Sequence, residues 1–175
     1  MRLNRRGPAV LGAALLSLVA LTGCGGDSWG EKAGLPAAGD IAAIEKIVAA
    51  HTTCSDLRTG TAGGRLAEET RDPAWAVRER AVCGDDARDT VTLLSIADMA
   101  KFQRANKAAA ARGKGVQVFL GQDFALAAAD PRTAKALLEA DVLLFACDKD
   151  FKVPDGYRNE ELLVDGCALT DYLPG

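Results

Sequence analysis

One histidine, His51, and five cysteines are the residues of this chain with the strongest intrinsic reactivity. A histidine catalyst needs an activated nucleophile and an orienting group within hydrogen-bond reach. The sequence contains no G-x-S-x-G motif, and no C-x-x-C pair accompanies His51 as in a zinc site. A lone histidine near the end of a helix is more often solvated or stabilised by the helix dipole. We therefore predict no catalytic residue and no metal site around His51 or Cys54, which follows it by three positions.

Carboxylates gather in short clusters that could bind calcium or catalyse hydrolysis. Asp148, Asp150 and Asp155 are spaced like calcium ligands, but Lys152 stands where a D-x-D-x-D loop needs its third acid. Adjacent carboxylates on a strand point to opposite faces, which does not suit the facing pair of a glycosidase. We expect all of these groups to be solvated. The same expectation covers Asp85, Asp86 and Asp89, and the pairs Glu68–Glu69 and Glu160–Glu161.

Three other polar residues are candidate contacts for a ligand or a partner. Gln122 and Asp123 follow a buried strand, and strand ends often carry ligand-binding groups. The alternative is a turn in which Asp123 caps backbone donors. Tyr172 combines apolar area with a polar tip, as contact residues of interfaces often do, although it could equally serve packing.

The first 24 residues have the features of an export signal. Three arginines precede an uncharged apolar run, Ala9–Leu21, which has the length of a signal-peptide core and is shorter than the roughly 20 residues of a spanning helix. The run ends in Leu21-Thr22-Gly23-Cys24. This ending resembles the lipobox of bacterial lipoproteins. The resemblance implies a diacylglyceryl group on the Cys24 thiol, cleavage before Cys24, and an optional further acyl chain on the new N-terminus.

The resemblance also implies a location. Two acyl chains anchor a protein stably, so the mature chain would stay on the outer face of the cytoplasmic membrane. The pair Arg5-Arg6 allows twin-arginine export; however, Gly7, Pro8 and Ala9 lack the apolar bulk expected after such a pair, and we expect Sec export instead. The high content of Ala, Gly and Arg is similar to that of small lipoproteins of actinobacteria.

Removal of residues 1–23 would change both the charge and the cysteine count. The 21 basic residues fall to 18 against 24 acidic ones, so the net charge moves from −3 to −6. This charge disfavours nucleic acid as a partner and gives no general attraction to anionic lipid. Beyond Cys24 the count of cysteines is even, which predicts two disulfides in an exported protein. Three pairings are possible, and shorter loops favour Cys54–Cys83 and Cys147–Cys167.

The expected elements follow from apolar spacing and from caps. Residues 24–39 are rich in Gly, Ala and Pro without a period, and predict a flexible tether. Asp40, the pair Ser95 and Asp98, and Asp130-Pro131 predict the starts of three helices. The expected strands are a hairpin of 74–83 with 90–96, and buried strands at 116–121 and 142–147.

This order predicts one small α+β domain over residues 40–175. We expect a mixed sheet of about four strands, covered by about three helices in a ferredoxin-like pattern and stapled by two disulfides. The tail after residue 147 should wrap around the domain.

The sequence names no reaction. It favours a membrane-anchored, extracytoplasmic binding module that contacts an envelope protein, a polymer or a small ligand, with no cofactor other than the lipid on Cys24. Two alternatives stay open: a small envelope enzyme that uses carboxylates or His51, and a solute-binding component of a transporter. The mature length is short for a two-lobed solute-binding protein.

Overall fold

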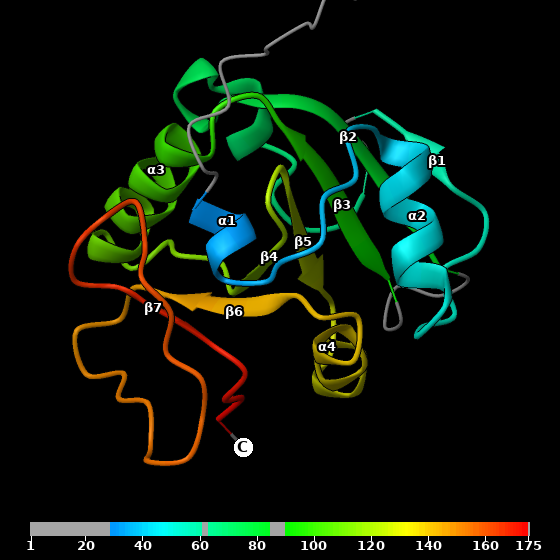
Figure 1. The fold of residues 1–175 in the computed structure, drawn as a ribbon. Helices are drawn as coiled ribbons and strands as arrows, with labels where there is room; N and C mark the ends of the chain where they lie inside the picture. The colour runs from blue at the N-terminus through cyan, green and yellow to red at the C-terminus, as the bar shows by residue number, and fades with distance from the viewer. Residues whose placement is uncertain (1–28, 61–62, 85–89, 175) are drawn as a thin grey trace, which may run out of the picture.

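The computed structural model describes residues 29–60, 63–84 and 90–174. Its centre is a sheet of seven antiparallel strands in the order β1-β2-β3-β5-β4-β6-β7 (Figure 1). The strands are β1 (Arg58–Thr59), β2 (Val77–Cys83), β3 (Val91–Ile96), β4 (Val118–Leu120), β5 (Phe124–Ala128), β6 (Leu143–Ala146) and β7 (Ala168–Thr170). The helices of the described residues are α1 (Trp29–Lys32), α2 (Ile41–Ala49), α3 (Met99–Ala111) and α4 (Pro131–Leu138), with short 3-10 turns η1 (Glu69–Arg71) and η2 (Pro73–Trp75).

The predicted ferredoxin-like sheet of four mixed strands is wrong, although the protein is α+β. The sheet has seven strands, and every neighbouring pair is antiparallel. The missed strands are β1, β5 and β7. β5 has the sequence Phe-Ala-Leu-Ala-Ala, and alanine has little intrinsic preference for strands. β1 and β7 have only two and three residues, too few to show a period.

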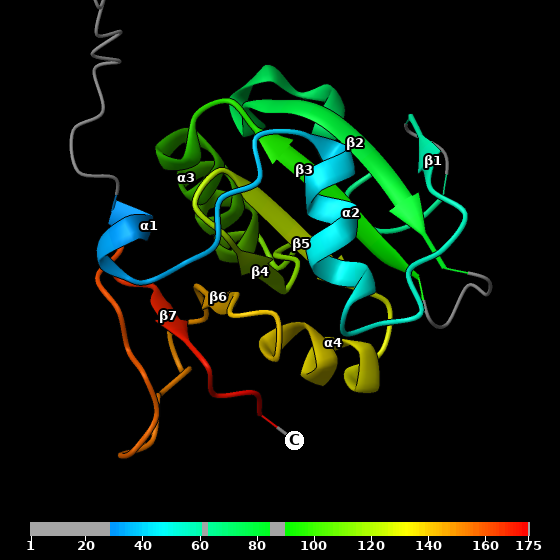
Figure 2. The same cartoon turned by 45° about the vertical axis from the view of Figure 1, so that its right-hand side comes forward.

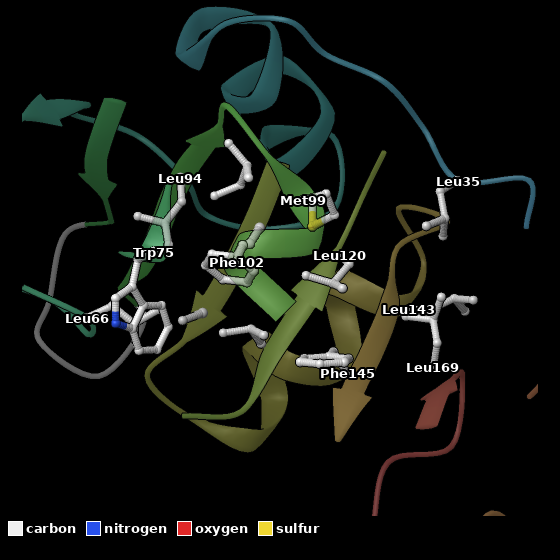
Figure 3. Close-up of a cluster of buried hydrophobic side chains, with 14 of the residues drawn as sticks. Leu35, Leu66, Trp75, Leu94, Met99, Phe102, Leu120, Leu143, Phe145 and Leu169 are labelled. Atoms are coloured by element: carbon white, nitrogen blue, oxygen red, sulfur yellow. The ribbon is translucent and has the colours of Figure 1, made fainter. Parts of the chain in front are cut away.

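Helices cover both faces of the sheet, whereas the predicted ferredoxin-like pattern has its helices on one side. Figure 2 shows α2 and α4 in front of the strands and α3 behind them. One apolar cluster joins Ile44 of α2 and Leu137 of α4 to one face of the sheet. A second cluster joins Phe102 of α3 to the other face, together with Trp75 and Leu35 (Figure 3). Strands covered on both faces need continuous apolar sequence rather than alternation, which explains why all six residues of β3 are buried.

The predicted helix starts at Asp40 and Asp130 are confirmed, whereas the pair Ser95 and Asp98 is confirmed only in part, because Asp98 caps α3 while Ser95 is buried in β3. Asp40 accepts a hydrogen bond from the Ala43 N–H, and Asp98 accepts one from the Lys101 N–H. The hydrogen bond from Lys101 lowers the pKa of Asp98 and outweighs a small opposing effect of burial. Asp130 accepts from the N–H groups of the first turn of α4 and from the Thr133 hydroxyl. Each cap satisfies amide groups that have no partner inside the helix.

Replacing Asp130 by alanine should lower the free energy of unfolding by about 1 kcal/mol at neutral pH. Burial raises the pKa of Asp130, but the hydrogen bonds from Thr133 and Arg132 outweigh it and leave the pKa below the ordinary value. A carboxyl with a depressed pKa in the folded state stabilises above its unfolded pKa, and this stability is lost as the pH falls through the folded pKa. Urea unfolding at several pH values should therefore show the wild type and Asp130→Ala converging below about pH 4. Asp130→Asn, which keeps a hydrogen-bond acceptor, should retain most of the free energy of unfolding. A loss of stability in Asp130→Ala that does not change with pH would contradict this account.

Residues 29–39 differ from the expected tether. Ala33 and Leu35 are buried in the cluster of α3, at 5% and 3% exposure. Trp29 packs against the same cluster. We call residues 29–39 the N-terminal strap. Residues 24–28, the rest of the expected tether, lie outside the described residues.

Candidate functional site

Two disulfides close the two ends of the sheet. They join Cys54 to Cys83 and Cys147 to Cys167, as predicted. Cys83 ends β2 and holds the segment that leads into β1, while Cys147 follows β6 and Cys167 precedes β7. Each bond therefore attaches a short edge strand to its neighbour. The two bonds differ in environment, because Cys54 and Cys83 are buried whereas Cys147 and Cys167 are partly exposed.

Gln122 and Asp123 lie in the turn between β4 and β5, where they bind the N-terminal strap. The Gln122 side chain donates to the Leu35 carbonyl at 2.6 Å. The Asp123 carboxylate accepts from the N–H groups of Ala38 and Gly39 at 2.9 and 2.7 Å. The two residues predicted as ligand contacts thus bind the protein's own backbone, as the capping alternative has it. The N–H groups that donate to Asp123 lie more than eighty residues earlier in the chain.

The strap is held by close contacts along its length. A Cβ atom at Gly30 would lie 2.9 Å from Cγ of Gln122, so the strap passes this side chain at a distance that only glycine permits. Arg158 donates to the Ala33 carbonyl, and Arg78 donates to the Gly39 carbonyl. Since these contacts come from distant parts of the chain, the strap is a packed part of the domain.

Replacing Asp123 by alanine should loosen the strap locally. The change removes the acceptor of two backbone N–H groups, each worth about 1 kcal/mol or more when the acceptor is charged. Hydrogen exchange should become about tenfold faster or more at Ala38 and Gly39. Exchange within β3 should stay unchanged, and Asp141→Ala, at an exposed carboxylate, should have no effect on the strap. Unchanged exchange at Ala38 and Gly39 would show that Asp123 does not hold them.

Tyr172 belongs to an aromatic cluster of the C-terminal tail. Its ring lies 4.9 Å from that of Tyr157 in an edge-to-face arrangement and 6.0 Å from that of Phe151. Tyr172 is half-buried, whereas Tyr157 is 49% exposed. Tyr172 therefore contributes to packing of the tail, and Tyr157 is the member of the cluster that offers its surface to solvent.

A groove of about 840 Å³ lies between the C-terminal half of α3, the end of β6 and the tail. We call it the α3–β6 groove. Phe145, Val116 and Phe151 supply apolar surface, and Lys107 and Lys149 supply positive charge. The full lining is Asn106, Lys107, Ala110, Ala111, Gly113, Gly115, Val116, Gln117, Phe145, Ala146, Cys147, Asp148, Lys149, Asp150, Phe151, Gly166 and Pro174. A mainly apolar concavity with a few polar groups is the usual form of a small-ligand site. No motif in the sequence points to this groove, because its residues come from four separate segments.

The other candidate groups lie apart from this groove or take part in local structure. His51 is exposed just beyond α2, and its backbone N–H donates to the Val48 carbonyl. Asp148, which lines the groove, accepts from the Asp150 N–H within its own turn. Glu68 pairs with Arg71, and Glu160 pairs with Arg158, at exposed or half-exposed positions. Asp85, Asp86, Asp89 and Cys24 lie outside the described residues.

The described part of the chain contains no group of three or more His, Cys, Asp or Glu side chains placed to hold a metal ion. Within the same residues, no helix combines the length and apolar character needed to cross a membrane.

Comparison with protein-family models, with curated proteins and with solved structures finds no significant match to this chain.

Proposed function

We propose that this protein is a lipoprotein, anchored through Cys24 to the outer face of the cytoplasmic membrane, whose domain binds an envelope partner or a small ligand without catalysing a reaction. The observation that carries the proposal is the cysteine usage. Two disulfides use Cys54, Cys83, Cys147 and Cys167. Such bonds persist in oxidising compartments outside the cytoplasm, and Cys24 is then the one cysteine left for lipid.

The position of the N-terminal strap determines how close such an anchor would hold the domain to the membrane. Trp29, the first described residue, packs on the domain. Only five residue steps separate it from Cys24, and a fully extended chain spans at most about 18 Å over that length. A lipid on Cys24 would therefore hold the domain close to the membrane surface. The proposed tether between the lipid and the domain therefore comprises residues 24–28 only.

Fatty-acid labelling of the full chain tests the anchor. In cells grown with an alkyne-tagged palmitate, the wild type should carry the label and Cys24→Ser should lose it. Ser17→Ala, a change within the apolar run that leaves the lipobox intact, should keep the label. A labelled Cys24→Ser variant, or an unlabelled wild type, would contradict the proposed anchor.

The α3–β6 groove favours binding of a small solute as a second form of the same function. Its volume falls within the range of roughly 300–1,000 Å³ that is usual for small-ligand sites. A thermal-shift screen over amino acids, sugars and sugar phosphates would test it on the purified protein. A ligand of the groove should raise the melting temperature of the wild type and of Ala108→Trp, but not of Ala111→Trp. Ala108 and Ala111 are exposed on α3 one turn apart, and only Ala111 lines the groove.

A further inference from the structure

The exposed face of α3 carries positive charge with little compensation. Lys101, Arg104 and Lys107 lie on this face, and Arg112 and Lys114 follow at the end of the helix. All five are exposed. The helix itself contains no acidic residue; its N-cap is Asp98. The exposed face of α3 is therefore basic, although the mature chain is acidic as a whole and the neighbouring tail segment has exposed carboxylates at Glu161 and Asp165.

Few of these charges are paired. Lys101 lies 3.6 Å from the Asp98 carboxylate, and Lys107 donates to the backbone carbonyl of Asp165. In the part of the chain that the structure describes, the ion pairs do not include Arg104, Arg112 or Lys114. These three residues, Arg104 on the helix and Arg112 and Lys114 just beyond its end, together raise the local potential and attract anionic surfaces.

The N-terminal strap, which leads toward the proposed anchor, packs on the same face of the sheet as this helix. The N-terminal strap and α3 share one apolar cluster, in which Leu35 and Phe102 both lie (Figure 3). Leu163, an apolar side chain that is 40% exposed, adjoins the helix, because its N–H donates to Gln103 of α3. α2 and α4 lie on the opposite face of the sheet.

We propose that the basic face of α3, with Leu163 beside it, rests on the anionic phospholipids of the membrane and fixes the orientation of the domain. This inference rests on the proposed lipid anchor at Cys24. The anchor limits the separation of Trp29 from the lipid to at most about 18 Å, and the basic side chains come within the screening length of about 8–10 Å when the domain tilts onto that face. The tail segment that carries Leu163 would then enter the interface, while the helices of the opposite face would point away from the membrane.

Lysine acetylation of the membrane-extracted, lipidated protein tests the orientation. The protein is reconstituted in neutral phosphatidylcholine vesicles and in vesicles that also contain phosphatidylglycerol. Each basic residue near an anionic surface favours the contact by about fivefold. We therefore expect acetylation of Lys101, Lys107 and Lys114 to be slowed about threefold or more on the anionic vesicles. High salt should remove the protection, and Lys135, exposed on α4, should react at the same rate on both kinds of vesicle.

Two variants separate the basic face from general adsorption. Arg104→Gln/Arg112→Gln keeps all three lysine reporters and should abolish their protection. Lys46→Gln/Arg132→Gln removes two exposed charges from the opposite face and should leave the protection intact. Equal protection of Lys135 and Lys101, or no difference between the vesicles, would overturn the proposed orientation. Protection that depends on protein density on neutral vesicles would identify a second copy of the chain as the occupant and would also overturn it.

The mass of the same sample distinguishes the two ways to fail. An unmodified Cys24 would refute the anchor, and with it the orientation. A lipidated, vesicle-bound protein without selective protection would refute the orientation alone.

Discussion

Replacing Cys54 and Cys83 together by alanine should lower the free energy of unfolding of the mature protein by about 3 to 4 kcal/mol. The bond closes a loop of 29 residues, for which chain entropy alone gives about 3.6 kcal/mol. The bond is buried, and it attaches β1, which pairs with β2 at only two positions. Urea unfolding measures the loss. Hydrogen exchange should also show that Arg58 and Thr59 lose protection before β3 does.

The second disulfide provides the matched control. Cys147→Ala/Cys167→Ala opens a loop of 20 residues, with a similar expected cost of about 3 kcal/mol. Its local effect should appear at the other edge of the sheet, in β7, rather than in β1. A loss below about 1 kcal/mol for either pair, or identical exchange patterns for both, would contradict the role of these bonds as separate attachments of the two edges.

Replacing Arg80 by methionine should lower the free energy of unfolding by about 2 to 3 kcal/mol and open the loop that covers β2. Arg80 is only 6% exposed, and its guanidinium donates to the carbonyls of Gly60, Gly63 and Arg65. Burial lowers the pKa of this guanidinium. Gly64 shows how closely the loop is held, because a Cβ atom there would lie 2.6 Å from the Thr92 hydroxyl.

Two effects oppose each other at Arg80. An apolar replacement of a buried charge removes a desolvation penalty and can be neutral or stabilising when the partners are replaced as well. In Arg80→Met the three backbone carbonyls stay in place without a donor. We expect the free energy lost by leaving them unsatisfied to exceed the desolvation free energy recovered by removing the buried charge. Limited proteolysis between residues 60 and 66 should become faster in Arg80→Met. Arg71→Met, at an exposed ion pair, should change stability by less than about 0.5 kcal/mol. An Arg80→Met variant more stable than the wild type would show that desolvation dominates.

Local signals predicted part of the fold well. Asp40 and Asp130 were correctly assigned as helix caps, since a cap is decided by neighbours within three residues. At the start of α3 the pair Ser95 and Asp98 was correct only in part, because Asp98 is the cap and Ser95 is a buried residue of β3. The hairpin of β2 and β3 was also correct in place, although Trp75 lies in the 3-10 turn before β2 rather than in the strand. The alternation of apolar and charged residues from Trp75 onward is typical of a strand, but in the structure Trp75 packs into the core from a 3-10 turn.

Long-range structure escaped prediction for physical reasons. β1 and β7 have two and three residues, too few for a sequence pattern, and each lies beside a disulfide whose cysteines are 20 or more residues apart. Besides the burial of Ala33 and Leu35, the N-terminal strap is held through its backbone by Gln122, Asp123 and Arg158. Backbone contacts of this kind leave no pattern in side-chain types. The turn at Gln122 and Asp123 follows the capping alternative, but the backbone groups that it binds could be found only in three dimensions. The α3–β6 groove was missed for the same reason.

The intact mass of protein extracted from membranes, measured before and after reduction and alkylation, tests the central proposal most directly. We predict a chain that begins at Cys24 and carries the mass of a diacylglyceryl group. Before reduction no cysteine should react with the alkylating agent, and after reduction four should react, in agreement with two disulfides and a blocked Cys24. A chain that begins elsewhere, an unmodified Cys24, or four reactive thiols without reduction would contradict the proposal.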